Sequence, residues 1–199
     1  MLFLVGAMFL SGCGGLMFYN HLGGIFTARL DASAANVTVA LLIVGLVGVL
    51  AVLFGGILTD EAGPRRADTF VLVGHCLALG GLALYLGDTT GSVTLAIFVL
   101  VGVWSIFAWA LSPVMQAGIM AASPERAMLA MSPGISGLYG GSAVGAAVGG
   151  YLLDQHGQAT IPVVDTVFLA VTVVSAVLGT RPVAATTVTN PVATQKPTV

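Results

Sequence analysis

Six long apolar stretches constrain this chain more than any other feature. They cover residues 2–22, 37–58, 69–86, 93–115, 128–153 and 161–178. Each is close to the roughly 20 residues that an α-helix needs to cross the hydrocarbon core of a bilayer. Within lipid only helices and closed barrels satisfy every backbone polar group, and barrel strands are about ten alternating residues long. We therefore predict an all-α membrane domain of six transmembrane helices over residues 1–180, followed by a flexible cytoplasmic tail over 181–199.

The composition excludes several other classes of protein. Only 7% of the residues are charged and 57% are hydrophobic, whereas a soluble domain carries about 25% charged residues. A net charge of −2 argues against nucleic-acid binding. We find no catalytic constellation, phosphate loop, zinc spacing or haem motif, so we predict no enzyme activity, no cofactor and no metal site. Cys13 and Cys76 lie inside apolar runs and are interpreted as packing residues.

The few cations predict the orientation. With six spans, both termini share a side with the loops after the second and fourth spans. Five of the six cations fall on that side: Arg65, Arg66, Arg126, Arg181 and Lys196. Because Lys and Arg are enriched in cytoplasmic loops, we expect both termini in the cytoplasm and a location in the cytoplasmic membrane. The first run lacks a basic segment before it and stays apolar beyond residue 10, so we expect a retained span rather than a signal peptide.

A charged cluster follows the second span. Asp60 comes where that span leaves the hydrocarbon, and Gly63 can adopt the left-handed conformation that ends a helix. Pro64 cannot continue the helix, and Arg65 and Arg66 follow it directly. This pattern predicts a tight reversal between two spans.

The chain contains an internal repeat. Residues 55–63 and 149–157 share Gly, Gly, Leu, Asp and Gly at five of nine positions. One copy ends the second span and the other ends the fifth, so the copies occupy equivalent places in two groups of three helices. The predicted topology puts them on opposite sides of the membrane. We therefore expect a 3+3 inverted repeat, an arrangement found in secondary transporters, although glycine pairs also recur by chance in glycine-rich chains.

Glycine and proline mark two further features. Gly137, Gly141, Gly145 and Gly149 recur every fourth residue and form one smooth helix-packing face. Such a face can be static packing, or it can slide against a partner during a conformational change. Pro113 and Pro133 each bend or end a span, or act as a hinge.

Several polar and aromatic side chains fall on the first and fourth spans. They are candidates for the lining of a cavity that takes an amphipathic or aromatic ligand, and packing or interfacial positions are the alternative. They are Tyr19, Asn20, Trp104, Trp109 and Gln116.

Titratable groups are scarce inside the spans. His75 is a candidate proton-linked residue, although a neutral histidine bonded to a neighbouring helix is the favoured explanation. Asp165 is expected at the headgroups, one turn into the last span, so no carboxylate is expected at mid-membrane depth.

The charged cluster resembles a known signature. The stretch Gly56-Ile57-Leu58-Thr59-Asp60-Glu61-Ala62-Gly63-Pro64-Arg65-Arg66 is similar to G-x-L-x-D-x-x-G-x-R-R, the cytoplasmic loop motif of the major facilitator superfamily. The region from Ser123 to Gly150 resembles the penultimate helix of its drug and sugar efflux branch. The resemblance covers residues 2–178 and corresponds to the C-terminal six helices of such a transporter.

This resemblance implies a secondary transporter that works by alternating access between two six-helix halves. The implied gating residues are Gly56, Asp60, Gly63, Arg65 and Arg66, with Asp60 near the start of the fifth span. It also implies that the first and fourth spans line the cavity. The second and fifth spans would contact the opposite half, which would then cover the Gly137–Gly149 face.

An N-terminal half is expected in this family and is missing from the chain. We therefore expect a half-size transporter or fragment that exports a small organic molecule or drug in exchange for protons. Its expected partners are the lipid bilayer, that substrate and a second six-helix half, either a copy of itself or a separate chain. A non-transporting membrane fragment or interaction subunit is the alternative.

Overall fold

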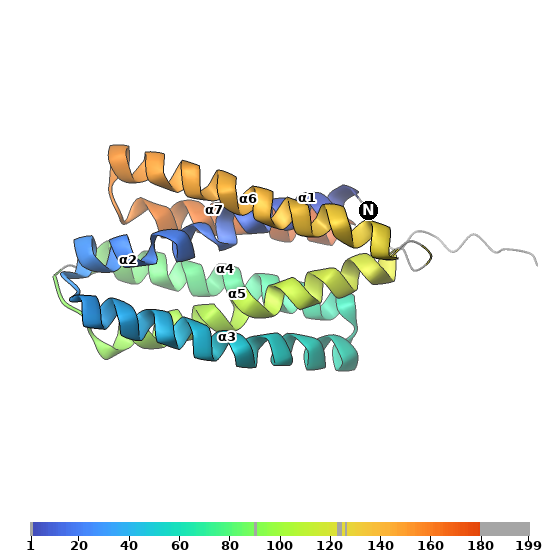
Figure 1. Ribbon diagram of the computed structural model, residues 1–199, viewed down its shortest axis with the longest axis horizontal. Helices are drawn as coiled ribbons and strands as arrows, with labels where there is room; N and C mark the ends of the chain where they lie inside the picture. The colour runs from blue at the N-terminus through green and yellow to red at the C-terminus, as the bar shows by residue number, and fades with distance from the viewer. Residues whose placement is uncertain (1, 90, 123–124, 126, 180–199) are drawn as a thin grey trace, which may run out of the picture.

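The computed structural model describes residues 2–89, 91–122, 125 and 127–179, and all regular structure in these ranges is helical. The helices are α1 (Leu2–Gly15), α2 (Met17–Leu30), α3 (Ala34–Ala62), α4 (Pro64–Asp88), α5 (Leu95–Ala122), α6 (Ala127–His156) and α7 (Thr160–Gly179). They form one elongated bundle with their axes roughly along its length (Figure 1). The predicted tail over 181–199 lies outside the described residues.

The seven helices make six spans, because α1 and α2 follow one another with only Leu16 between them. The all-α fold predicted from the apolar stretches is confirmed. Three described helices are individually long and apolar enough to cross a membrane: Ala34–Ala62, Pro64–Asp88 and Leu95–Ala121. Thr160–Ala176 is a shorter apolar helix. In α6, glycine and serine dilute the hydropathy of a helix that is 30 residues long.

Most helices extend beyond the apolar stretches that predicted them. The expected loop after residue 22 is helical as far as Leu30, and α3 begins three residues before the predicted start. Ser33 caps α3, where its hydroxyl accepts a hydrogen bond from the Asn36 N–H at 3.3 Å. Hydropathy reports where a helix leaves lipid rather than where its hydrogen bonds stop, so these differences fall at the ends.

The packing repeats with the helix order. The most extensive contacts are those of α1 with α6 and of α3 with α5, which pair the first helix of each group of three with the second helix of the other. The contacts of α1 with α7 and of α4 with α5 form the next equivalent set, and α4 packs against α7 between the groups. This pattern is the expected 3+3 arrangement.

The two copies of the sequence repeat share their local geometry. Gly63 and Gly157 end α3 and α6 with φ angles of 82° and 80°, which glycine adopts without strain. The Gly63 N–H donates to the Thr59 carbonyl at 3.0 Å, and the Gly157 N–H donates to the equivalent Leu153 carbonyl at 3.2 Å. The two copies therefore match in backbone geometry as well as in sequence.

The aligned glycine pairs also match. A Cβ added at Gly55 would lie 2.7 Å from the Ala110 carbonyl oxygen, and one at Gly149 would lie 2.5 Å from the His21 ring. Their neighbours Gly56 and Gly150 have no other atom within 4 Å of that position. In each copy the first glycine therefore allows close helix approach and the second lies on an open face.

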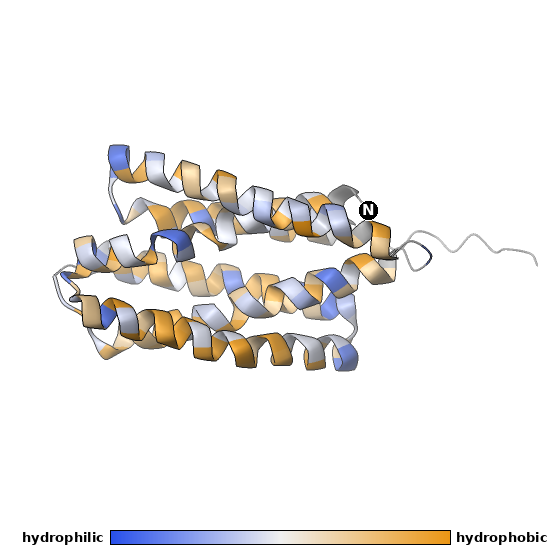
Figure 2. Ribbon diagram, in the orientation of Figure 1, coloured by the Kyte–Doolittle hydropathy of each residue, from blue (hydrophilic) through white to orange (hydrophobic). Residues whose placement is uncertain are grey.

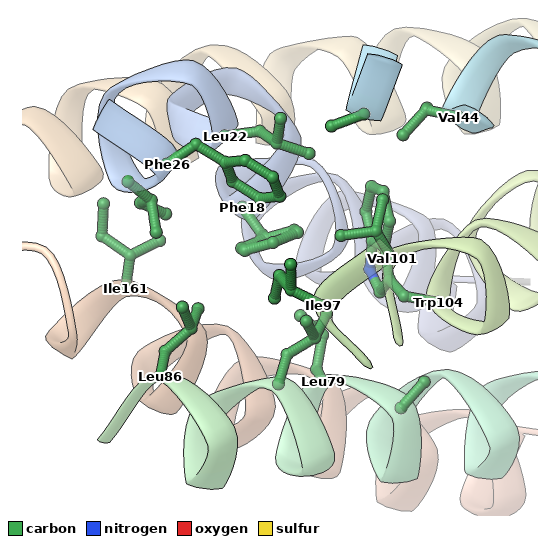
Figure 3. Close-up of a cluster of buried hydrophobic side chains, with 14 of the residues drawn as sticks. Phe18, Leu22, Phe26, Val44, Leu79, Leu86, Ile97, Val101, Trp104 and Ile161 are labelled. Atoms are coloured by element: carbon green, nitrogen blue, oxygen red, sulfur yellow. The ribbon is translucent and has the colours of Figure 1, made fainter. Parts of the chain in front are cut away.

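A cluster of buried apolar side chains fills one end of the bundle around α2 (Figure 3). Phe18, Leu22 and Phe26 of α2 are fully buried and meet side chains from α4, α5 and α7. The Phe18 and Trp104 rings make an edge-to-face contact with centroids 5.1 Å apart. This cluster holds α2 between α4, α5 and α7 at that end of the bundle.

Hydrophobic residues predominate along α3, which suits a lipid solvent (Figure 2). On α3, Leu46 is 70% exposed and Leu53 is 61% exposed. An apolar patch of this extent is rare on monomeric soluble proteins. The chain is therefore an integral membrane protein by both its sequence and its surface.

Arg29 joins the ends of two helices. Its Nε donates to the Leu86 carbonyl at 2.7 Å and its terminal nitrogen donates to the Gly87 carbonyl at 2.8 Å. Its own carbonyl accepts a bond from the Gly91 N–H at 3.0 Å. The last carbonyls of a helix have no partners within it, so Arg29 satisfies the end of α4 and fastens it to the end of α2.

Candidate functional site: a pocket at an interrupted helix

The first span is interrupted halfway along its length. Leu16 separates α1 from α2, with φ −102° and ψ −8°. Gly14 and Gly15 come directly before it, and the missing side chains let two other helices approach the interruption. A Cβ at Gly15 would lie 2.9 Å from Cε1 of His75 in α4, and one at Gly14 would lie 3.1 Å from the Asp165 carbonyl oxygen in α7.

A pocket of about 290 Å³ lies beside this interruption. Side chains of all the spans except α3 and α7 contribute to it: Met8, Ser11, Gly15, Leu16, Tyr19, Asn20, His75, Ala108, Trp109, Leu111, Ser112, Met115, Leu138, Tyr139 and Ser142. Its volume is near the lower end of the range for small-molecule sites. The pocket reaches the surface at Tyr139, which is 67% exposed.

The pocket lies at the middle of the helices that form it. His75 is one residue from the centre of α4, while Ala108 and Ser142 lie at the centres of α5 and α6. Leu16 is at the centre of the interrupted span. A helix that crosses a bilayer has its centre near the midplane, which is the depth where secondary transporters hold substrates, often beside a discontinuous helix.

The polar groups of the pocket are hydroxyls, an amide, an indole N–H and an imidazole. The Asn20 amide donates to the Ser142 hydroxyl at 3.4 Å. The Ser112 hydroxyl accepts a bond from the Gln116 amide at 2.9 Å. His75 is 1% exposed, and neither ring nitrogen has a hydrogen-bond partner among the described residues. An unsatisfied buried polar group is costly, so the pocket presents hydrogen-bonding capacity that the described chain leaves unused.

Three of the five expected cavity residues line the pocket. Tyr19, Asn20 and Trp109 lie in its wall, and the Tyr19 and Trp109 rings meet edge to face with centroids 5.8 Å apart. Gly48 makes room for Trp109, because a Cβ there would lie 2.9 Å from Cδ1 of the indole.

The expectation for the other two needs correction. Trp104 is fully buried in the core, because its ring packs between Phe18 and His75 rather than facing the pocket. Gln116 directly follows the lining residue Met115 but is not itself in the wall, and its amide donates to the hydroxyl of Ser112, which is.

Asp165 lies in the interior rather than at the headgroups. Its side chain is fully buried, and neither carboxylate oxygen has a hydrogen bond of normal geometry among the described residues, although the Phe18 main-chain N–H faces the carboxylate. The main-chain carbonyl of the next residue, Thr166, accepts a hydrogen bond from Cys76 Sγ at 3.8 Å, which places this turn of α7 beside the centre of α4. The expectation was wrong because α7 is packed deep against α1 and α4 from its first turn.

The glycine face of α6 packs against α1 of the same chain. The Cβ position of Gly141 overlaps the Phe9 carbonyl, that of Gly145 overlaps the Cys13 carbonyl, and that of Gly137 lies 3.4 Å from the Val5 carbonyl. The resemblance had implied that the opposite half would cover this face. The structure instead uses it to bring two backbones of one half together, so it supports the α6 wall of the pocket.

The gating-loop residues lie at the junction of α3 and α4. Gly63 makes the turn, Asp60, Arg65 and Arg66 are exposed, and Gly56 faces open space. The end of α3 and the start of α6 are well separated (Figure 1), and these helices make no extended contact among the described residues. Asp60 therefore does not meet the start of the fifth span, as the resemblance had implied.

Sequence reasoning missed part of the site. The missed pocket residues include Ser11, Ser112, Ser142 and Tyr139, and Asp165 was placed at the wrong depth. A signal was present, because the three serines are small polar residues close to the centres of apolar helices. The sequence around Asp165 did not indicate that it is buried, because its burial depends on which helices pack against α7.

These features define a class of protein: a six-helix membrane bundle with inverted repeats, an interrupted first span and a pocket at mid-depth. The fold is that of one half of a transporter of the major facilitator type. It is similar to the in meso crystal structure of PepTSo, a transporter of the POT family, with a TM-score of 0.72 and 15% sequence identity. The match covers 89% of this chain and 36% of PepTSo, so the chain spans about a third of that transporter's length. No protein-family model matches the chain.

Proposed function

We propose that this chain is one half of a secondary active transporter and that the pocket beside Leu16 binds a small organic substrate. The observation that carries this proposal is the pocket's position at mid-length of the helices, against an interrupted span and an unsatisfied imidazole. A substrate bound there would contact groups on α1, α2, α4, α5 and α6.

The transport cycle needs a second six-helix half. The pocket opens beside exposed Tyr139 and Asn20, and a facing half would enclose it. That half is a second copy of this chain or a separate chain. Alternating access then follows from rocking of the two halves around the pocket. The gating loop at Asp60, Arg65 and Arg66 would contact the other half, since α6 of this chain lies away from it.

For the direction and coupling of transport, we propose efflux of a drug-like organic molecule in exchange for protons. The efflux direction is supported by the sequence resemblance around the α3–α4 junction and α6. Coupling is supported by His75 and Asp165, two buried titratable side chains on α4 and α7, because the His75 ring and the Asp165 main-chain carbonyl approach Gly15 and Gly14 of the interruption. A charge on the His75 ring would have no hydrogen-bond partner among the described residues, so gain of a proton there would disturb the packing beside Leu16.

The cytoplasmic membrane and cytoplasmic termini remain part of the proposal, supported by the bias of five cations to one. Labelling of a single cysteine placed at Arg66 in spheroplasts tests it. Reaction with a membrane-impermeant maleimide from outside would refute this orientation.

Substrate binding can be tested with the two tryptophans. Trp109 lines the pocket and Trp104 is in the core, so Trp104→Phe and Trp109→Phe each leave one reporter. A panel of uncharged aromatic compounds added to the purified chain should quench Trp109 fluorescence and leave Trp104 unchanged. Ser142→Leu, which fills the pocket, should abolish the quenching. Equal quenching of both reporters would mean non-specific partition into the bundle.

Transport is tested separately in proteoliposomes that contain the chain alone or with any neighbouring six-span chain. Wild-type protein should accumulate the bound compound when a proton gradient is applied. Asp165→Asn should retain exchange of substrate across the membrane but lose accumulation driven by the gradient. Binding without flux in every assembly would refute the transporter and favour the alternative of a non-transporting membrane subunit.

A further inference from the structure

A second hollow lies on the lipid-facing side of α4, away from the substrate pocket. It has a volume of about 730 Å³ and is lined at one end by Arg65 and Arg66. Its remaining length is apolar and includes Phe70, Val73 and Leu77 of α4 and Phe107 of α5. We refer to it as the α4 groove.

The groove owes its shape to one glycine. A Cβ at Gly74 would lie 2.5 Å from Cδ1 and 2.7 Å from Cζ of Phe107, so that ring occupies the place of a side chain on α4. Phe107 in turn meets Phe70, with ring centroids 6.0 Å apart and planes at 59°. The two aromatic rings make a smooth apolar floor between α4 and α5.

The length of the groove matches one leaflet of a bilayer. Arg65 and Leu77 are twelve residues apart on a continuous helix, and at 1.5 Å per residue this distance is about 18 Å. Half of a typical hydrocarbon core is about 15 Å. The arginines therefore lie at headgroup level when Leu77 is near the midplane. Phe70 is 53% exposed and Leu77 is 71% exposed, so an occupant can reach the whole groove from the side.

The arginines at one end of the α4 groove indicate which kind of molecule it binds. Arg65 and Arg66 both line this end, and a guanidinium group favours a phosphate because it can donate paired hydrogen bonds to it. The same end carries the cations that predict a cytoplasmic location, and anionic lipids are concentrated in that leaflet. Phosphate at one end and a long apolar channel below it are the chemistry of a phospholipid.

From this geometry we propose that the α4 groove is a binding site for an anionic phospholipid, with the headgroup phosphate on Arg65 and Arg66 and an acyl chain along Phe70, Val73 and Leu77. The bound lipid would tie the α3–α4 junction to the membrane surface. This site is separate from the substrate pocket and does not depend on transport.

The test uses the full chain purified in detergent and titrated with phosphatidylglycerol or phosphatidylcholine, with lipid adducts counted by native mass spectrometry. Wild-type protein should retain one phosphatidylglycerol in preference to phosphatidylcholine. An arginine near an anionic surface contributes roughly a fivefold gain in affinity, so Arg65→Gln with Arg66→Gln should weaken binding roughly 25-fold. Arg65→Lys with Arg66→Lys keeps the charge and should give an intermediate loss.

Two further variants separate the groove from general charge effects. Arg126→Gln removes another cation that the sequence predicts on the same side of the membrane, and should leave retention unchanged. Leu77→Asp keeps both arginines and puts a charge on the acyl path, so it should weaken phosphatidylglycerol binding without displacing Phe107. Equal retention of both lipids, or equal loss in Arg126→Gln and the double glutamine variant, would overturn the proposal and leave only unselective lipid contact.

Discussion

Gly55 and Gly56 are neighbours in α3 with opposite surroundings, so replacing each by alanine tests the helix packing directly. A Cβ at Gly55 would lie 2.7 Å from the Ala110 carbonyl oxygen and 3.2 Å from the Ala110 Cα. Carbon and carbonyl oxygen normally approach no closer than about 3.3 Å, so α3 and α5 must separate by roughly 0.6 Å. Both contacting atoms belong to the main chain of α5 and cannot rotate away.

The expected effects of the two substitutions differ in sign. A gap of about 0.5–1 Å forfeits a quarter to a half of each dispersion contact that it opens, and overpacking typically costs about 1–3 kcal/mol. We expect Gly55→Ala to destabilise the bundle by about that amount. Gly56→Ala meets no atom within 4 Å and should stabilise the helix by up to about 1 kcal/mol, because alanine loses less backbone entropy than glycine.

The assay is thermal unfolding of both variants in the same lipid nanodiscs, followed by the loss of monodisperse protein on heating. For a chain of this length 1 kcal/mol corresponds to roughly 2–4 °C in melting temperature, so Gly55→Ala should melt several degrees below wild type. Gly56→Ala should melt at or slightly above the wild-type temperature. Equal melting temperatures for the two variants would refute the close approach of α3 and α5 at Ala110.

Three further predictions concern other contacts. Phe18→Ala should cost about 3–5 kcal/mol, because the ring is fully buried, and should shift Trp104 emission to longer wavelength in a Trp109→Phe background; unchanged emission would contradict the core assignment. Arg29→Gln should cost about 1.5–3 kcal/mol and speed deuterium uptake at the end of α4, since two carbonyls lose a charged donor, whereas Arg126→Gln should leave that uptake unchanged. Gly157→Val should lower the free energy of unfolding by about 1–3 kcal/mol, because the φ angle at this position is 80°. A similar loss for Gly63→Val would show that the two junctions are equivalent. Gly87→Val should cost less, because Gly87 has an ordinary helical conformation.

The sequence predicted the features that depend on local chemistry. Runs of apolar residues set the number of spans, because backbone groups in lipid must be satisfied within a helix. Gly63 and Gly157 identified the repeat, since only glycine adopts their backbone conformation without strain. Tyr19, Asn20 and Trp109 were identified as pocket residues because aromatic and polar side chains are conspicuous in apolar helices.

The features that sequence reasoning missed depend on how helices meet. The interruption at Leu16 lies within a continuous apolar run, and its only local sign is the Gly14-Gly15 pair. Trp104 and Trp109 are five residues apart on α5, yet the first packs in the core and the second lines the pocket, because their rings face different neighbours. The burial of Asp165 likewise follows from the depth of α7 in the bundle.

The clasp that Arg29 makes has a consequence for movement. It holds α2 to the end of α4, and the apolar cluster around Phe18 anchors the same segment, so α2 is the fixed arm of the interrupted span. The other arm, α1, packs against α6 at Gly137, Gly141 and Gly145, and the next glycine of the same face, Gly149, meets His21 of α2. The glycine face of α6 therefore spans both arms, and a bend at Leu16 would move one arm along a surface on which no side chain stands in its way.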